Sequence, residues 1–198
     1  MNRRDHLVLT AERLFQQNGY RATGIDRILA ESGVAKMTLY KYFPSKDDLV
    51  LAVLRGRSAR WRASMEQAVA RRAAAPRDRL LAVFDVFEEW FASPGFAGCL
   101  FLKASSEYGA PEDPVHRAAA EHHRDLLAYL RDLATAAGAR RPAQLARQLM
   151  LLAIGATAVT QVNGPVGAGR EARAAAAALL GQFLDWDGHL PSAVAAPA

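Results

Sequence analysis

Cysteine is nearly absent from this chain of 198 residues, in which Cys99 is the only thiol. A single thiol cannot form an intrachain disulfide, so the fold needs no oxidising compartment, and a reduced cytoplasm is the expected location. Long hydrophobic runs are also missing. The longest candidate, Leu149 to Val159, is too short to cross a bilayer, and the N-terminal segment has no uninterrupted apolar stretch before its acidic residues. No membrane partner is therefore expected.

Strand patterns and catalytic motifs are lacking as well. Almost no segment alternates polar and apolar residues, whereas almost every segment repeats its apolar residues at helical spacing. The sequence has no Gly-rich phosphate loop and no nucleophile–base pair. It therefore predicts an all-α protein that is not an enzyme, with no catalytic residue, no cofactor and no bound metal.

Positive charge is present but unevenly distributed. The whole chain has 25 Lys or Arg against 20 Asp or Glu, a net charge of +5. The first 60 residues hold 11 basic and 6 acidic side chains, and the remainder holds 14 of each. A basic module beside a neutral one is expected if the first binds phosphates and the second has another role.

Nine helices are predicted from the apolar spacing and from the Gly, Pro and Ser breaks between them. They cover about residues 3–18, 24–32, 35–42, 45–74, 76–92, 98–107, 114–137, 142–162 and 170–186. Thr23 and Ser45 are the expected N-caps of the second and fourth helices, and Gly19 is the expected end of the first. Residues 191–198 have few large side chains, and a disordered tail is expected there.

The most informative stretch runs from Gly19 to Leu49. It contains the two short helices at about 24–32 and 35–42, separated by a turn that includes Gly33. Two helices joined by such a turn form a helix-turn-helix, and the second of them reads bases in the major groove of DNA. The basic character of this region agrees with that interpretation.

An ordered set of short motifs runs through the same region. The motifs are A-x-x-L-F, G-Y-x-x-T, an I-A-x-x-A-G-V-like segment, T-L-Y-x-Y-F and S-K-x-x-L, carried here by Ala11, Leu14 and Phe15; Gly19, Tyr20 and Thr23; Ile28, Leu29, Gly33 and Val34; Thr38 to Phe43; and Ser45, Lys46 and Leu49. In this order they resemble the DNA-binding domain of TetR-type (tetracycline-repressor-like) transcriptional regulators. Leu29 replaces the usual Ala, Gly24 replaces a frequent Thr or Ser, and Met37 replaces a frequent Gly or Pro, so no operator sequence transfers from a relative.

The resemblance implies a three-helix DNA-binding domain followed by a helical ligand-binding and dimerisation domain. The corresponding ranges are 1–45 and 46–190, with 46–74 as the helix that links them. It also implies a homodimer, a palindromic double-stranded operator and a small-molecule effector as partners. The expected function is a repressor whose two recognition helices lie about 34–36 Å apart on DNA. Effector binding would swing the linking helix and change that spacing.

Eight residues are the candidate DNA contacts. Lys36, Met37 and Thr38 are expected to reach base edges from the start of the recognition helix, because its N-terminal residues lie nearest the bases. Contacts with the DNA backbone are expected from Thr23, Tyr40, Lys41, Tyr42 and Lys46. The resemblance supports Tyr42 and Lys46 in that role. For Tyr40 the alternative is packing inside the domain core.

The central helices are rich in aromatic residues, which favours an apolar ligand pocket between them. The candidate ligand residues are Trp61, Met65, Phe84, Phe87, Trp90, Phe91, Phe101 and Tyr108, with His116 and His123 as polar contacts. For each aromatic the alternative is ordinary core packing at helical spacing. Cys99 lies among apolar residues and is interpreted as a small buried side chain.

Three histidines leave a second hypothesis open, a small helical enzyme or metal-binding protein that uses His116, His122 and His123. Their spacing disfavours it, since helical zinc sites use pairs three or four residues apart. A third hypothesis is a DNA binder without a ligand, acting as an activator or a broad nucleoid protein.

The last two predicted helices are the candidate dimer interface, because large apolar faces alternate there with small residues. The interface set is Leu145, Leu149, Leu152, Ala156, Val159, Leu180, Phe183 and Leu184. Two such helices from each chain would form a four-helix bundle about a two-fold axis, as the resemblance also implies. The alternative is the internal core of a monomer.

Overall fold

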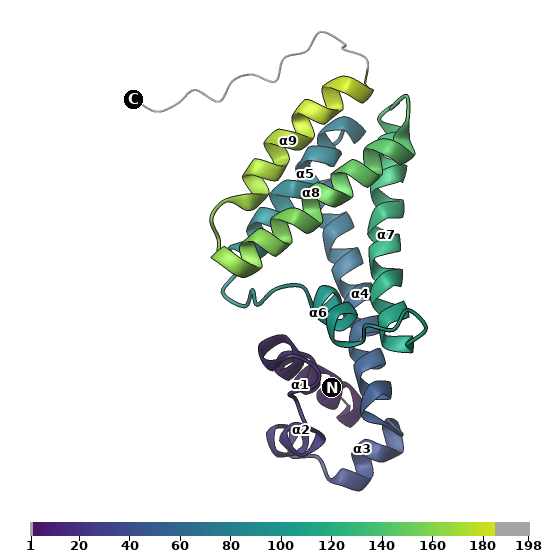
Figure 1. The fold of residues 1–198 in the computed structure, drawn as a ribbon, viewed down its shortest axis with the longest axis vertical. Coiled ribbons are helices and arrows are strands. Elements are labelled where there is room, and N and C mark those ends of the chain that lie inside the picture. Colours follow the sequence, from purple (N-terminus) through teal and green to yellow (C-terminus); the bar gives the residue numbers. More distant parts are fainter. Residues whose placement is uncertain (1, 185–198) are drawn as a thin grey trace.

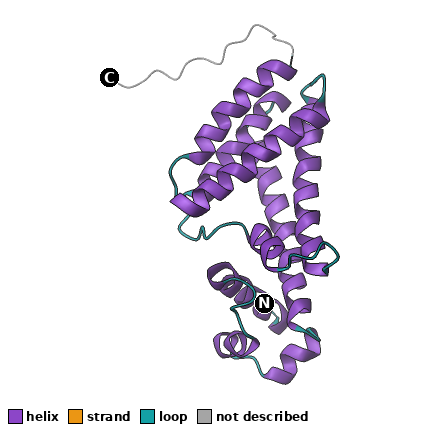
Figure 2. Ribbon diagram, viewed as in Figure 1, coloured by secondary structure: helices purple, strands orange, loops and turns teal. Residues whose placement is uncertain are grey.

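A computed structural model describes residues 2–184, and in that range helices are joined by loops and there is no strand (Figures 1 and 2). The all-α prediction is confirmed. The helices are α1 Arg3–Asn18, α2 Ile25–Ser32, α3 Lys36–Tyr42, α4 Lys46–Arg72, α5 Pro76–Phe91, α6 Leu100–Glu107, α7 Pro114–Ala136, α8 Pro142–Asn163 and α9 Ala168–Phe183. The predicted end of the ninth helix at Trp186 and the predicted tail at 191–198 lie outside the described residues.

The helix ends follow local chemistry at most positions. Gly19 and Gly33 end α1 and α2 with φ angles of 83° and 64°, a left-handed conformation that side-chain-bearing residues rarely adopt. Ser45 caps α4 as predicted. Its hydroxyl accepts the Asp48 N–H at 3.1 Å, and the Asp48 carboxylate accepts the Ser45 N–H at 2.9 Å, which completes a capping box.

The prediction that Thr23 caps α2 is wrong. Gly24 occupies the N-cap position, with no side-chain hydrogen bond to the helix. Thr23 is fully buried, and its hydroxyl donates to the Gly19 carbonyl at 2.7 Å. The hydroxyl therefore stabilises the turn after α1 instead of the start of α2.

Helices α1, α2 and α3 form a small unit, here called the head, at the lower end of the molecule in Figure 1. Its core contains Phe15, Tyr20, Ile28 and Leu39, all fully buried. The first half of α4 belongs to the same core through fully buried residues such as Val53. The head is thus built on α4 as well as on its own three helices.

Helices α5 to α9 and the second half of α4 form a larger unit, here called the body. Its core combines the second half of α4 with α5, α7, α8 and α9, around side chains such as Phe84, Leu130 and Leu180. Among the described helices α8 alone is long and apolar enough to cross a membrane by length and composition. In this structure α8 packs against α7 and α9, as expected for the core helix of a helical bundle.

Helix α6 is the part of the body that lies next to the head, and it contacts both the head and α7 (Figure 1). The Glu107 carboxylate accepts the backbone N–H groups of Tyr20 at 2.9 Å and Arg21 at 2.6 Å. Just before α6, the Gly98 carbonyl accepts a hydrogen bond from the Gln16 side chain at 2.7 Å. These bonds connect residues more than 80 positions apart and fix the head against the body.

Replacement of Ser45 by Ala tests the cap of α4. We expect the free energy of unfolding to fall by about 1 kcal/mol, because the Asp48 N–H loses its side-chain acceptor. Urea unfolding followed by circular dichroism measures the change. Ser64→Ala, at an exposed position inside the same helix, is the matched control and should change stability by less than about 0.5 kcal/mol. Equal losses in the two variants would contradict a capping role.

Candidate nucleic-acid interface and interior pocket

The outer face of α3 is the most prominent exposed surface of the head. Leu39 and, just after the helix, Phe43 point into the core and anchor α3. Met37 is 86% exposed and Lys36 is also exposed. An apolar side chain and a cation are thus presented together at the first turn of the helix, where a groove-binding helix makes base contacts.

Lys36 is only weakly engaged within the protein. Its Nζ lies 3.9 Å from the Asp26 carboxylate, and both side chains are mostly exposed. Such surface pairs contribute little, so the Lys36 ammonium is available to another acceptor. Lys41 and Tyr42 are exposed farther along, and Thr38 is half-buried.

Three further candidates for DNA contact are placed differently. Tyr40 is 41% exposed, so the alternative of a core position does not hold. Lys46 is half-buried, its Nζ donates to the Arg21 carbonyl at 3.4 Å, and burial lowers the pKa of its ammonium group. Thr23 requires a correction, because its buried hydroxyl is engaged with backbone carbonyls and is not available to phosphate.

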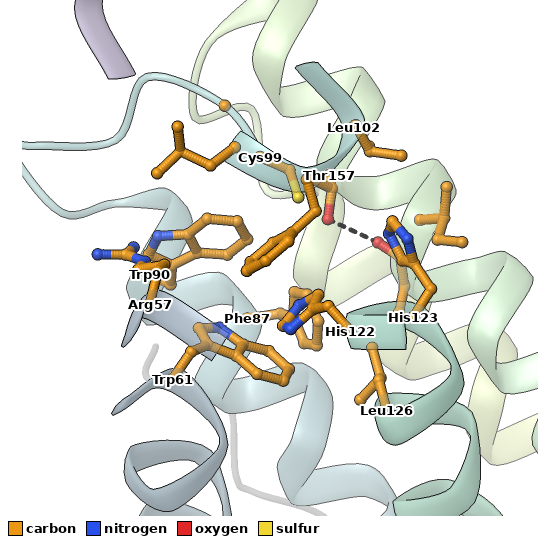
Figure 3. A pocket seen from close by; sticks show the side chains of 15 residues that line it. Arg57, Trp61, Phe87, Trp90, Cys99, Leu102, His122, His123, Leu126 and Thr157 are labelled. Atoms are coloured by element: carbon orange, nitrogen blue, oxygen red, sulfur yellow. Dashed lines mark hydrogen bonds between the residues drawn. The ribbon is translucent and has the colours of Figure 1, made fainter. Parts of the chain in front are cut away.

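A pocket lies inside the body where α4, α5, α6, α7 and α8 meet (Figure 3). Its walls are mainly aromatic and aliphatic, and Arg57 is its only Lys, Arg, Asp or Glu. The free volume is about 30 Å³, on the order of one water molecule. A ligand larger than that must displace side chains.

The imidazole of His122 lies at the centre of the pocket wall. It stacks on Phe101 with ring centroids 3.6 Å apart and meets Trp61 edge-on at 4.9 Å. Its Nδ1 is hydrogen-bonded to the Ser58 hydroxyl at 2.9 Å. Burial lowers the pKa of His122 to about 3 and also lowers the pKa of His123. Both rings are therefore neutral near pH 7 and serve as flat, weakly polar wall groups.

The predicted ligand residues separate into three groups. Trp61, Phe87, Trp90, Phe101 and His123 line the pocket, and Met65 lines an adjoining groove. The other four predictions need correction. Phe84 and Phe91 are core residues, and Tyr108 and His116 lie at the junction of α6 and α7, outside the pocket. There the Tyr108 hydroxyl donates to Asp47 at 2.8 Å, and His116 Nδ1 donates to the Tyr108 carbonyl at 2.8 Å.

Several pocket residues were not among the predicted ligand contacts. The missed residues are Arg57, Gly98, Cys99, Leu100, Leu102, His122, Leu126, Ala153, Ile154 and Thr157. Helical spacing gave a usable signal for one of them, since Arg57 precedes Trp61 by four residues and therefore shares its face of α4. Cys99 is buried, and burial raises the pKa of its thiol, so it is a wall group of low reactivity.

The three histidines do not come together. His116 contacts the end of α6, while His122 and His123 face the pocket. Within residues 2–184 no group of three or more His, Cys, Asp or Glu side chains is arranged to hold a metal ion. The second hypothesis therefore has no support from geometry.

The predicted dimer interface also needs correction. Six of its eight residues are buried inside the protomer, namely Leu145, Leu149, Ala156, Leu180, Phe183 and Leu184. Val159 is 43% exposed and Leu152 is half-buried. Most of the predicted residues therefore lie on the inward side of the last two helices. The outward face of α8 presents Leu151, which is 70% exposed, and Val162, which is 82% exposed.

Small residues accompany these exposed apolar side chains. On α8, Gly155 and Ala158 are exposed, and on α9 so are Ala174, Ala178 and Gly181. Helices with small exposed residues allow a partner helix to approach closely. The two helices lie side by side on one side of the body (Figure 1).

Two family models match the chain. The model of bacterial regulatory proteins of the tetR family matches residues 7–53, and that of the tetracyclin repressor-like C-terminal domain matches residues 76–176. Among curated proteins, the HTH-type transcriptional repressor NemR of Escherichia coli is 29% identical over 128 residues, which are 64% of this chain and 64% of NemR. The chain thus matches less than two thirds of the length of that relative.

Solved structures share the whole architecture. The crystal structure of a TetR-family transcriptional regulator from Streptomyces coelicolor has a TM-score of 0.86 and 33% sequence identity, covering 92% of this chain and 96% of that one. The reduced form of Escherichia coli NemR has a TM-score of 0.81 at 25% identity, covering 89% and 95%.

The buried imidazole predicts a pH dependence of stability. In the unfolded chain His122 takes up a proton near pH 6.5, but in the folded chain only near pH 3. Between these values the unfolded state binds more protons, so stability falls as the pH falls. From about pH 7.5 to about pH 5.5, His122 should account for a loss of about 1.4 kcal/mol in the free energy of unfolding.

Urea unfolding of His122→Gln at the two pH values measures this contribution. The variant should lose about 1.4 kcal/mol less than the parent protein on acidification. His116→Gln, which leaves His122 and its surroundings intact, should show the full acid-dependent loss. The same acid-dependent loss in His122→Gln and in the parent would contradict a buried neutral imidazole.

Proposed function

Because the chain belongs to the TetR family of bacterial regulatory proteins, we propose that it acts as a homodimeric DNA-binding repressor in the cytoplasm. We further propose that a small-molecule ligand releases it from a palindromic operator. The observation that carries this proposal is the exposed cationic and aromatic face of α3, held on a head whose position depends on helices that also line a pocket.

At the DNA, α3 enters the major groove with its first turn nearest the bases. Lys36 donates to guanine O6 and N7, Met37 contacts a thymine methyl group, and Thr38 bonds to a base or a phosphate. Tyr40, Lys41, Tyr42 and Lys46 contact the backbone and set the register. Thr23 is left out of this set because its hydroxyl is buried.

Two heads on one two-fold axis are needed to read a palindrome. The outward face of α8 and α9 is proposed as the dimer interface, with Leu151, Val159 and Val162 packed into the small residues of the partner. Their exposure supports this role, since a contiguous apolar face on a water-soluble protomer is expected to be covered. The paired helices would form a four-helix bundle.

The ligand acts on DNA affinity through the elements shared by pocket and head. Cys99 and Phe101 line the pocket, and the adjacent Gly98 carbonyl holds Gln16 of the head. Opening the pocket moves the start of α6 and the middle of α4, and hence the head. A ligand shifts this equilibrium only by its difference in affinity for the two states.

Titration with the DNA upstream of the chain's own gene tests the DNA-binding part. We expect protection of a near-palindrome and at least tenfold preference over a scrambled duplex, roughly 1.4 kcal/mol. Lys36→Ala should reduce that preference, because it removes a base contact worth about 1–3 kcal/mol. Fluorescence anisotropy at two salt concentrations measures both duplexes.

Arg124→Ala provides the matched control for this experiment, because it removes an exposed cation from α7 in the body. It should leave the preference unchanged. Equal affinity for both duplexes with a steep salt dependence would favour the broad DNA binder. No binding to either duplex would contradict the assignment of α3 as a recognition helix.

Leu151→Asp tests the proposed dimer interface. A charge at this exposed apolar position should prevent the faces from pairing, because it would be buried without a partner. We expect a monomer in analytical ultracentrifugation and at least about a 100-fold loss of operator affinity, since a single half-site remains. Ala70→Asp, at an exposed position of α4, should remain a dimer. A dimeric Leu151→Asp would contradict this interface.

A further inference from the structure

A groove between α4 and α5 adjoins the pocket and is lined by two arginines instead of one. Its volume is about 310 Å³, within the range of small-molecule sites. Trp61, Phe87 and Trp90 line both the groove and the pocket, and so does Arg57. Arg60 is a second arginine that lines the groove, and none of the described residues that line it is Asp or Glu. Two arginines thus line a site with aromatic walls.

Both guanidinium groups are paired with one carboxylate of the head. Glu12 of α1 accepts from Arg57 Nη1 at 3.2 Å through one oxygen and from Arg60 Nη2 through the other. The Glu12 side chain is 11% exposed, whereas those of Arg57 and Arg60 are 33% and 50% exposed. The ion pairs join the head directly to a wall of the ligand site.

We propose that the effector is a carboxylic acid with a flat aromatic or apolar body, and that its carboxylate replaces Glu12 on Arg57 and Arg60. This inference rests on the proposed function of the protein. The fork of an Arg side chain matches a planar carboxylate in two parallel hydrogen bonds. The body of the ligand lies against Trp61 and Trp90, where its apolar surface is removed from water.

The replacement has a consequence for the head. Glu12 without Arg57 and Arg60 would be a nearly buried carboxylate without its two cations, which is a strongly disfavoured state. It is relieved when the middle of α4, which carries Arg57 and Arg60, shifts relative to α1 and Glu12 reaches water. A single competition for two Arg side chains therefore converts ligand binding into displacement of the DNA-binding head.

The same charges discriminate among ligand classes. An amine of similar shape is repelled by two guanidinium groups, and a primary amide can accept a hydrogen bond from an Arg side chain through its carbonyl oxygen but forms no ion pair. A carboxylate can form ion pairs with both guanidinium groups, and it does so in place of Glu12. Acids should therefore bind more tightly than amides of the same shape, and only acids should displace the head.

The test compares three acids, benzoate, phenylacetate and 2-naphthoate, with their primary amides. Isothermal titration calorimetry of the DNA-free full-length protein measures each affinity. We expect at least one acid to bind about tenfold more tightly than its amide, a preference set by charge-assisted hydrogen bonds. Arg60→Gln and Arg57→Gln should each reduce the ratio below about threefold. Arg71→Gln, an exposed cation near the end of α4, should leave it unchanged.

Glu12→Gln tests whether the ligand carboxylate competes with Glu12 for the two Arg side chains or is only attracted by their charge. Without the competing carboxylate, the affinity for the best acid should rise by about three- to tenfold while the affinity for its amide stays the same. The variant keeps a side chain of the same size, and its thermal unfolding checks that it is folded. An acid affinity that is unchanged or lower in Glu12→Gln would overturn the exchange.

Three other results would overturn the proposal. They are equal binding of every acid and its amide, an acid preference that survives both Arg variants, and no binding of any acid up to about 5 mM. DNA affinity is measured separately on the operator. A protein that binds its operator but shows no acid preference refutes this inference alone. One that shows acid preference without operator binding refutes the proposed regulator.

Discussion

The structure depends on one continuous helix that belongs to two cores. Helix α4 has 27 residues and is about 40 Å long, longer than either unit alone requires. Val53 packs in the head, and Val69 packs in the body. Because a packed helix moves as a rigid rod, a change at its middle alters the position of its start. The pocket, the groove and the Glu12 ion pairs all lie at that middle section.

The body is held together by apolar packing, whereas the head is joined to it by polar contacts as well as apolar ones. Phe84, Leu130 and Leu180 interlock α5, α7 and α9 in a close-packed core that resists displacement. Residues of α6 and α7 such as Leu100 and Val115 share the apolar core of the head. The further contacts between head and body are polar, from the Glu107 carboxylate, the Gly98 carbonyl and the Glu12 ion pairs. Such contacts can be exchanged for bonds to water or to a ligand at a smaller free-energy cost than a packed core.

Exposure separates residues that serve the fold from those available to partners. Leu39 and Met37 lie on the same short helix, yet one is an anchor and the other is almost fully solvated. Leu149 and Leu151 lie two residues apart on α8 with the same contrast. In each helix the inward side chain fixes the orientation, and the outward one defines a surface for DNA or for a second protomer.

The sequence by itself determined the helices, the helix-turn-helix and the family, because apolar spacing, capping residues and ordered motifs are local features of the chain. Ser45 at the start of α4 and Gly19 at the end of α1 are examples. Only the tertiary structure decided that Thr23 is internal, that Leu145 and Phe183 face the core, and that Glu12 meets Arg57 across 45 positions. These outcomes depend on which faces of distant helices pack together, and spacing along one helix does not specify its neighbour.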